Sequence, residues 1–277
     1  EQRARFESHG DVDLAIVIND QRYRASVAKG SRGHVVVLRL LATKIPQLED
    51  LNLPPVLHTV SDIASGLVLV TGPTGSGKST SLAALVNKIN AEKPAHILTI
   101  EDPIEFVHEN QRSLVLQREV GRDAPSFAQA LRAALREDPD VVLVGELRDL
   151  ETVSLALTAA ETGHLVLATL HTNGAPSTIN RIIDTFPAEQ QGQVRAQLAQ
   201  TLRVVMTQRL YKRAGGSGRV GAYEVMVCNN AVKNLIREGK IHQIESVMQT
   251  ARGDGMQTME SHVQQLRASG LIAAGMD

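Results

Sequence analysis

Gly72-Pro-Thr-Gly-Ser-Gly-Lys78-Ser79-Thr80 matches the pattern G-x-x-x-x-G-K-S/T at every fixed position. The apolar run Leu67–Val70 before it predicts a buried strand. Leu82, Leu85 and Ile89 recur after it at helical spacing, so the stretch joins a strand to a helix. Glycines let backbone N–H groups close around phosphate oxygens, and the helix N-terminus adds positive potential. The stretch therefore predicts a phosphate-binding loop, and a glycine turn that matches by chance is a weak alternative.

Two side chains of this loop have predicted roles beyond the backbone cradle. Lys78 is placed to reach the β and γ phosphates of a nucleotide, and Ser79 is placed to hold Mg²⁺. The loop residues that we expect to bind nucleotide are Thr74, Gly75, Ser76, Gly77, Lys78, Ser79 and Thr80.

From the phosphate loop onward, apolar strands alternate with helices, which predicts an α/β fold with a mostly parallel sheet covered on both faces. The expected strands are Leu67–Thr71, Ile97–Ile100, Val141–Val144 and Leu165–Leu170. The expected helices run over Ser126–Glu137 and from an N-cap at Asp149 to Thr162, with Gly163 as the stop. Beyond Pro187 we expect a further helix with an apolar stripe, then the short strand Gly221–Val227 and three short helices. The stripe consists of Val194, Leu198, Leu202 and Val205.

The first part of the chain has a different pattern, an antiparallel meander. Its expected strands are Val12–Ile18, Arg22–Val27 and Val35–Leu40, with turns at Asn19-Asp20 and Lys29–Gly33. A proline-punctuated segment with a short helix follows, over residues 45–55. We predict an N-terminal domain over residues 1–42, a linker over 43–58 and a second domain over 59–277, helical from residue 188. Because the chain opens close to a strand pattern, we expect an N-terminal part to be missing.

The amino-acid composition limits the classes of function that the protein can have. The 277 residues are 43% hydrophobic and 21% charged, which is ordinary for a globular protein with a full core. The net charge of −1 gives no basic surplus, so nucleic acid is not expected as a partner. The longest apolar runs have the length of a strand, far short of a membrane span. Cys228 is the only cysteine, which excludes a disulfide framework and a cysteine zinc cluster, fits a reducing, cytoplasmic setting and predicts a buried side chain.

Acidic residues follow two of the predicted strands at their carboxyl ends, where parallel sheets bind ligands. Glu146 comes just after Val141–Val144 and is predicted to orient Mg²⁺ or its water shell; a capping acid at a strand end is the alternative. Glu101, Asp102 and Glu105 compete for the role of the base that positions the attacking water. At least one of these three is expected to be structural.

Two histidines and two arginines are further candidates. His171 directly follows the strand Leu165–Leu170 and can sense a γ-phosphate, although lone histidines are often structural. His164 stands at the opposite end, roughly 20 Å away, so geometry predicts a structural role or a subunit contact. Arg24 and Arg39 lie on the N-terminal strands and could swing toward the phosphates when the domains close; a solvated strand face is the alternative that spacing favours.

Three further stretches resemble motifs of the secretion-superfamily ATPases, and within them of the type IV pilus retraction ATPases (the PilT family). Ile97–Phe106 resembles the aspartate box, Ala134–Thr152 the Walker B region and Thr158–His171 the histidine box. With the phosphate loop, these motifs make the resemblance specific, and it extends over essentially the whole chain. It implies a RecA-like core, a PAS-like N-terminal domain that is incomplete here, and hydrolysis of ATP with Mg²⁺ by a homohexamer.

The resemblance also implies residue roles and partners. Glu105 takes the place of the catalytic glutamate and Glu146 that of the Walker B glutamate, while Arg24 and Arg39 match arginines that face nucleotide. The catalytic residues that it implies are Glu105, Glu146, His164 and His171. The expected partners are an inner-membrane pilus platform protein and, indirectly, the pilus machinery, with the motor cytoplasmic and peripheral at the inner membrane.

Two features favour retraction over pilus extension and type II secretion. The relatives with those roles usually carry a four-cysteine zinc motif, which a single cysteine cannot form. Ala231–Glu238 resembles the late signature of the retraction family, with Val232 and Lys233 in place of the usual Ile and Arg. A related secretion, conjugation or pilus-assembly ATPase is the first alternative. A nucleotide-binding regulatory module with little turnover is the second, because a phosphate loop by itself indicates binding and not hydrolysis.

Overall fold

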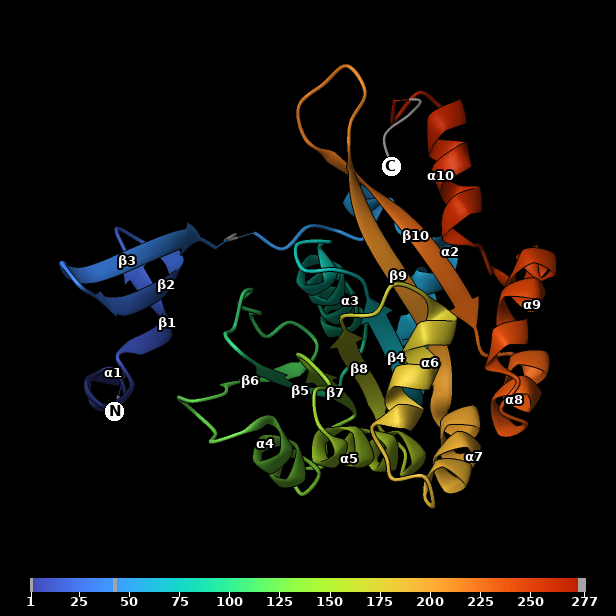
Figure 1. The fold of residues 1–277 in the computed structure, drawn as a ribbon, viewed down its shortest axis with the longest axis horizontal. Helices are drawn as coiled ribbons and strands as arrows, with labels where there is room; N and C mark the ends of the chain where they lie inside the picture. The colour runs from blue at the N-terminus through green and yellow to red at the C-terminus, as the bar shows by residue number, and fades with distance from the viewer. Residues whose placement is uncertain (1, 42–43, 274–277) are drawn as a thin grey trace.

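The computed structural model describes residues 2–41 and 44–273 (Figure 1). They form a three-stranded sheet of order β1-β2-β3 and a seven-stranded sheet of order β10-β9-β4-β8-β7-β5-β6. The N-terminal sheet lies to one side of the large one. Among the described residues, no helix combines the length and apolar character needed to cross a membrane.

The N-terminal unit is the predicted antiparallel meander, preceded by a helix that the sequence pattern did not reveal. It comprises α1 (Gln2–His9), β1 (Asp11–Ile18), β2 (Gln21–Gly30) and β3 (Gly33–Leu40). Asn19 and Asp20 both have positive φ, 50° and 62°, which is the backbone of a tight hairpin turn. Arg24 and Arg39 are direct cross-strand partners of β2 and β3, so the two side chains share one face of this sheet.

The large sheet confirms the α/β prediction with a mostly parallel arrangement. Its strands are β4 (Gly66–Thr71), β5 (His96–Glu101), β6 (Leu114–Glu119), β7 (Val141–Val144), β8 (Leu165–Leu170), β9 (Leu202–Lys212) and β10 (Arg219–Val227). Neighbouring strands are parallel except at the edge, where β10 runs antiparallel to β9. β6 is a further strand that the sequence pattern did not reveal.

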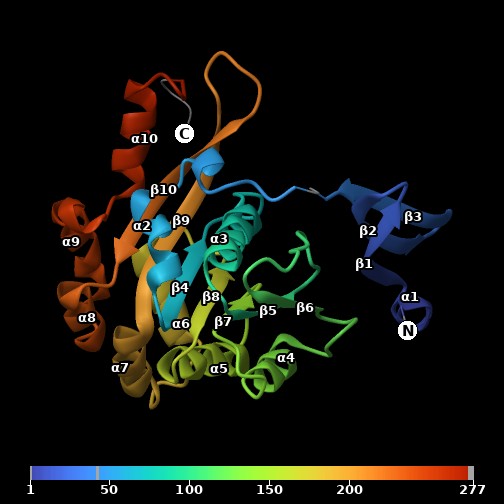
Figure 2. The same ribbon diagram turned by 180° about the vertical axis from the view of Figure 1, so that it is seen from behind.

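Helices cover both faces of this sheet. They are α2 (Pro55–His58), α3 (Lys78–Glu92), α4 (Phe127–Ala134), α5 (Leu150–Glu161), α6 (Ala175–Asp184), α7 (Gln191–Thr201), α8 (Asn230–Arg237), α9 (Ile244–Thr250) and α10 (Met259–Ala268). Leu67 and Leu69 of β4 pack with α4 to α9, whereas Val68 and Val70 pack with α3. Figure 2 shows α2 and α3 on this second face. The period of two along β4 therefore places one buried cluster on each side of the sheet.

The segment expected as a linker packs against the second face. Leu48, Leu53 and Leu57 are buried in the same cluster as Val68 and Val70. The Tyr223 hydroxyl donates a hydrogen bond of 2.8 Å to the Leu51 carbonyl, which fastens the segment to β10. The domain division at residues 42 and 58 stays a prediction.

The predicted helix beyond Pro187 is wrong in its second half. Val194 and Leu198 lie in α7, but Leu202 begins β9 and Val205 lies within it. β9 lies between β4 and β10, and nearly all of its first seven residues are buried. A strand covered on both faces is apolar at successive positions, so its periodicity cannot be distinguished from that of a buried helix.

Candidate active site

The phosphate loop lies where predicted, between the end of β4 and the start of α3 at Lys78. Gly72 and Gly77 have φ of 135° and 90°, which favour glycine. A Cβ on Gly72 would lie 2.3 Å from the Gln208 carbonyl oxygen, and one on Gly77 would lie 2.8 Å from Gln208 Nε2. Backbone conformation therefore favours glycine at both positions, and at Gly72 the backbone of β9 also leaves no room for a Cβ.

Lys78 is the central cation of the site. Its Nζ donates hydrogen bonds to the carbonyl oxygens of Gly72 (2.8 Å) and Pro73 (3.1 Å) and lies 3.3 Å from His171 Nδ1. Burial lowers the pKa of Lys78, and the charges of Glu146 and Glu105 oppose that shift. The structure thus brings together residues from the ends of four segments that the sequence analysis singled out separately.

A cavity of about 660 Å³ surrounds this group, within the usual size range of small-molecule sites. Its walls come from the N-terminal sheet, the phosphate loop and the carboxyl ends of β5, β7 and β8. Every residue predicted to bind nucleotide or act in catalysis lines it, except Ser76 and His164; the lining residues with predicted roles are Arg24, Arg39, Thr74, Gly75, Gly77, Lys78, Ser79, Thr80, Glu105, Glu146 and His171.

Glu146 is held from two sides. Arg148 Nη2 lies 2.7 Å from Glu146 Oε2, and Arg148 Nε donates to the same oxygen at 2.8 Å. On the other side, His171 Nε2 lies 3.4 Å from Glu146 Oε1. Glu146, His171 and Lys78 therefore form one continuous row of polar side chains that lines the cavity.

The three acids near the end of β5 occupy different environments. Glu101 accepts hydrogen bonds from Thr99 Oγ1 (2.7 Å) and Gln117 Nε2 (3.2 Å). Burial raises the pKa of the Glu101 carboxyl against those hydrogen bonds. All three acids line the cavity around Lys78. The hydrogen bonds to Glu101 suit a structural role, and of the three acids it is Glu105 whose charge acts on Lys78. This contrast favours Glu105 over Glu101 as the base.

Ser76 and His164 lie outside the cavity lining. The Ser76 hydroxyl is buried and has no hydrogen-bond partner among the described residues. His164 Nδ1 lies 3.0 Å from the Ala159 carbonyl oxygen and 3.3 Å from Thr162 Oγ1, at the end of β8 opposite to His171. The structure therefore does not bring His164 to the nucleotide pocket of its own chain.

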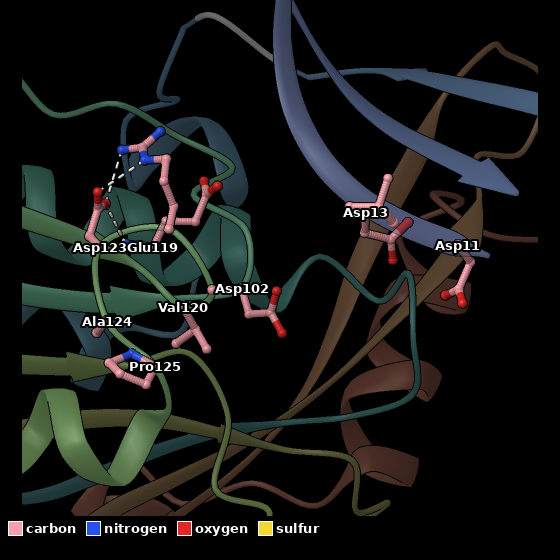
Figure 3. A pocket seen from close by; sticks show the side chains of 11 residues that line it. Asp11, Asp13, Asp102, Glu119, Val120, Asp123, Ala124 and Pro125 are labelled. Atoms are coloured by element: carbon pink, nitrogen blue, oxygen red, sulfur yellow. Dashed lines mark hydrogen bonds and ion pairs between the residues drawn. The ribbon is translucent and has the colours of Figure 1, made fainter. Parts of the chain in front are cut away.

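A second cavity, of about 620 Å³, shares Asp102 with the first, and its charged lining is mainly carboxylates (Figure 3). Asp11 and Asp13 of β1 stand on one side of it, and Asp102 and Glu119 stand on the other. Arg122 is paired with Asp123, with Nη2 2.9 Å from Oδ2. Phosphates would meet repulsion here, so the cavity around Lys78 is the one that suits an anionic ligand.

Comparison with known proteins agrees with this geometry. Residues 3–217 match the family described as type II/IV secretion system protein. The chain belongs to this family. It is 52% identical over 273 residues to a twitching motility protein of Neisseria gonorrhoeae, a match that covers 98% of this chain and 73% of that protein.

A second relative and a solved structure indicate which members of this family of secretion ATPases the chain resembles. The type IV pilus retraction ATPase PilT of Pseudomonas aeruginosa is 52% identical over 273 residues, covering 98% of this chain and 79% of that protein. A crystal structure of the pilus retraction motor PilT with bound ADP has a TM-score of 0.91 and 50% identity, covering 98% of this chain and 78% of that one. These matches confirm the predicted membership and fold, and they support a nucleotide as the ligand of the cavity around Lys78.

The family implies Mg²⁺, and the donor set fits it. The Ser79 hydroxyl and the Glu146 carboxylate line the same cavity, and hard oxygen donors are what Mg²⁺ prefers. The described residues contain no group of three or more His, Cys, Asp or Glu that could hold a metal by themselves. One or two protein oxygens together with substrate phosphates are the usual arrangement for Mg²⁺ at a nucleotide.

Sequence reasoning missed several residues of the site. Arg148 lines the cavity but is separated from its partner Glu146 by only one residue, a spacing without a predictive signal. Leu210 and Arg219 also line it, from the two antiparallel strands at the far edge. Gln208 reaches the phosphate loop from β9, where its Oε1 accepts a hydrogen bond of 2.8 Å from Ser81 Oγ. All of these depend on β9 and β10, or on side-chain orientation, which no motif records.

Proposed function

We propose that this chain is a Mg²⁺-dependent ATPase that drives type IV pilus retraction, and therefore twitching motility. The observation that carries the proposal is that the cavity around Lys78 contains the predicted phosphate loop, acids and histidine in a chain that closely matches a pilus retraction motor along nearly its full length. An alternative in the same family is a secretion, conjugation or pilus-assembly ATPase.

The residues that line the cavity would have different roles in the reaction. The loop N–H groups and Lys78 would grip the β and γ phosphates, and Glu105 would position and deprotonate the attacking water. His171, next to both Lys78 and Glu146, would respond to the γ-phosphate. Arg24 and Arg39 would neutralise phosphate charge from the N-terminal sheet. Mg²⁺ held at Ser79 and Glu146 would supply Lewis-acid stabilisation of charge on the phosphates.

The assembly and location belong to the same proposal. We expect a homohexamer, peripheral to the cytoplasmic side of the inner membrane, acting on a platform protein and through it on the pilus. His164 lies outside the pocket of its own chain, so we propose that it acts at a contact with a neighbouring subunit.

Purified protein tests the enzymatic part. Lys78→Ala and Glu105→Ala should abolish steady-state phosphate release from ATP. Lys78→Ala removes the cation that binds the phosphates, and Glu105→Ala removes the base. Lys88→Ala, later on α3, and Glu109→Ala, in the loop after β5, are matched controls that should keep turnover. Normal turnover by either site variant would contradict the site assignment. Binding of ATP by wild-type protein without turnover would favour a regulatory module.

A deletion strain tests the cellular part. Loss of twitching with surface pili retained, restored by the wild-type gene and not by Lys78→Ala, is the expected result for a retraction motor. Normal twitching together with defective secretion or conjugation would favour the alternative family role.

A further inference from the structure

Arg148 is a charged side chain of the cavity to which the proposed function gives no role. It lies between β7 and α5, two residues after Glu146. Its Nε donates a hydrogen bond of 2.8 Å to Glu146 Oε2, and its Nη2 lies 2.7 Å from the same oxygen. The Arg148 side chain is 60% exposed and that of Glu146 is 20% exposed. An exposed arginine therefore holds a mostly enclosed carboxylate.

These contacts hold Oε2 on the side of Arg148. With Oε2 occupied, Oε1 faces His171 Nε2 at 3.4 Å, and His171 Nδ1 in turn faces Lys78. The last torsion of a glutamate is broad and weakly restrained by itself. Without the guanidinium, the carboxylate would be free to turn toward another cation of the cavity.

Lys78 lies on the other side of the same imidazole, since His171 contacts Glu146 with Nε2 at 3.4 Å and Lys78 with Nδ1 at 3.3 Å. Glu146 is the largest of the charges that act on Lys78, so the two are close enough to attract each other. Direct pairing would neutralise Lys78 and occupy the ammonium that must receive phosphate. Arg148 competes with Lys78 for Glu146 through a charge-assisted contact of two guanidinium nitrogens with one carboxylate oxygen.

We propose that Arg148 is a positioning residue, which holds Glu146 away from Lys78 and thereby keeps the lysine available to nucleotide phosphate. The inference rests on the proposed nucleotide site and not on turnover. A direct phosphate ligand and a surface ion pair of no consequence are the two competing explanations, because exposed pairs often contribute little.

ADP affinity in the presence of a chelator separates these explanations, because neither metal nor hydrolysis contributes to it. We would measure ADP binding by calorimetry to wild-type protein, Arg148→Gln, Arg148→Lys, Glu146→Gln and the double variant Glu146→Gln/Arg148→Gln. Arg132→Gln is the matched control, since Arg132 pairs with Glu151 on the outer helices and is similarly exposed.

Arg148→Gln should weaken ADP binding about fivefold, the effect expected from one partly exposed charge pair. Arg148→Lys should lie between wild type and Arg148→Gln, because it keeps the charge but has one nitrogen in place of the two that contact Oε2. Glu146→Gln and the double variant should bind ADP equally well, since no carboxylate remains to compete for Lys78. Arg132→Gln should match wild type.

Three results would overturn the proposal. An equal loss of affinity from Arg148→Gln in both backgrounds would make Arg148 a direct phosphate ligand. Unchanged affinity in every arginine variant would leave a surface ion pair without function. A fall in melting temperature for Arg148→Gln, absent in Arg132→Gln, that tracks the loss of affinity in both backgrounds would indicate support of the fold. Wild-type protein that binds ADP but does not hydrolyse ATP would contradict the proposed function alone.

Discussion

His108 lies in the segment between β5 and β6 with most of its ring buried, and its Nδ1 has no hydrogen-bond partner among the described residues. Burial lowers the pKa of this histidine from 6.5 to about 4. Between those values the unfolded chain binds a proton that the folded chain does not, so stability is complete above pH 6.5 and falls as the pH approaches 4. The free energy of unfolding that is lost in this way reaches at most about 3 kcal/mol at the acidic end of this range.

Replacing this residue should therefore flatten part of the acid limb of the stability profile. We expect the urea midpoint of His108→Gln to fall less than that of wild type between pH 7 and pH 4.5. His242→Gln, at an exposed position, should follow wild type. The profile will not become flat, because burial also lowers the pKa of His262. Parallel profiles for His108→Gln and wild type would contradict the assignment.

At the scale of elements, β9 is more than an added strand, because it supports the phosphate loop. Gln208 is 3% exposed and accepts the hydrogen bond from Ser81, while Thr207 Oγ1 lies 2.9 Å from Thr71 Oγ1 at the end of β4. Gln208→Leu should cost about 1–3 kcal/mol, because the buried Ser81 hydroxyl loses its partner. Adding Ser81→Ala should recover most of that loss. Chemical unfolding of the single and double variants measures the coupling, and strictly additive losses would contradict it.

The elements also show how far the sequence could predict the structure. Val141–Val144 and Leu165–Leu170 are strands with the predicted bounds. Asp149 caps α5 as expected, since its side chain accepts a hydrogen bond from the Thr152 backbone N–H. These predictions rest on local signals, namely apolar runs, caps and glycine stops. β9 was mistaken for helix because it is buried on both faces, and this is a property of the assembled sheet.

The same distinction holds within the site. The phosphate loop and the strand-end residues Glu105, Glu146 and His171 could be predicted, because strand order brings carboxyl ends to one edge of a parallel sheet. The contact of Arg148 with Glu146 and that of Gln208 with the phosphate loop could not be predicted. They depend on rotamers and on a register between strands that are more than a hundred residues apart in sequence.

At the scale of the whole molecule, the N-terminal sheet contributes one wall of the nucleotide cavity. Arg24 and Arg39 line that wall as cross-strand partners, and Arg24 Nη2 lies 3.5 Å from Asp13 Oδ2. The Arg22 guanidinium donates a hydrogen bond of 3.0 Å to the Ile104 carbonyl oxygen, next to Glu105. The two sheets therefore meet where the base and the phosphates would lie, and the position of one sheet can depend on what the other binds.

This arrangement predicts that the N-terminal arginines contribute to nucleotide affinity through charge. Arg24→Ala and Arg39→Ala should each weaken ADP binding about five- to tenfold at low salt, and the difference from wild type should shrink as salt screens the partly exposed charges. Arg32→Ala, in the exposed turn between β2 and β3, is a matched control because it removes the same charge from the same sheet outside the cavity. Affinities equal to that of Arg32→Ala at every ionic strength would contradict a direct role, because the sheet would then close the cavity by shape and not by charge.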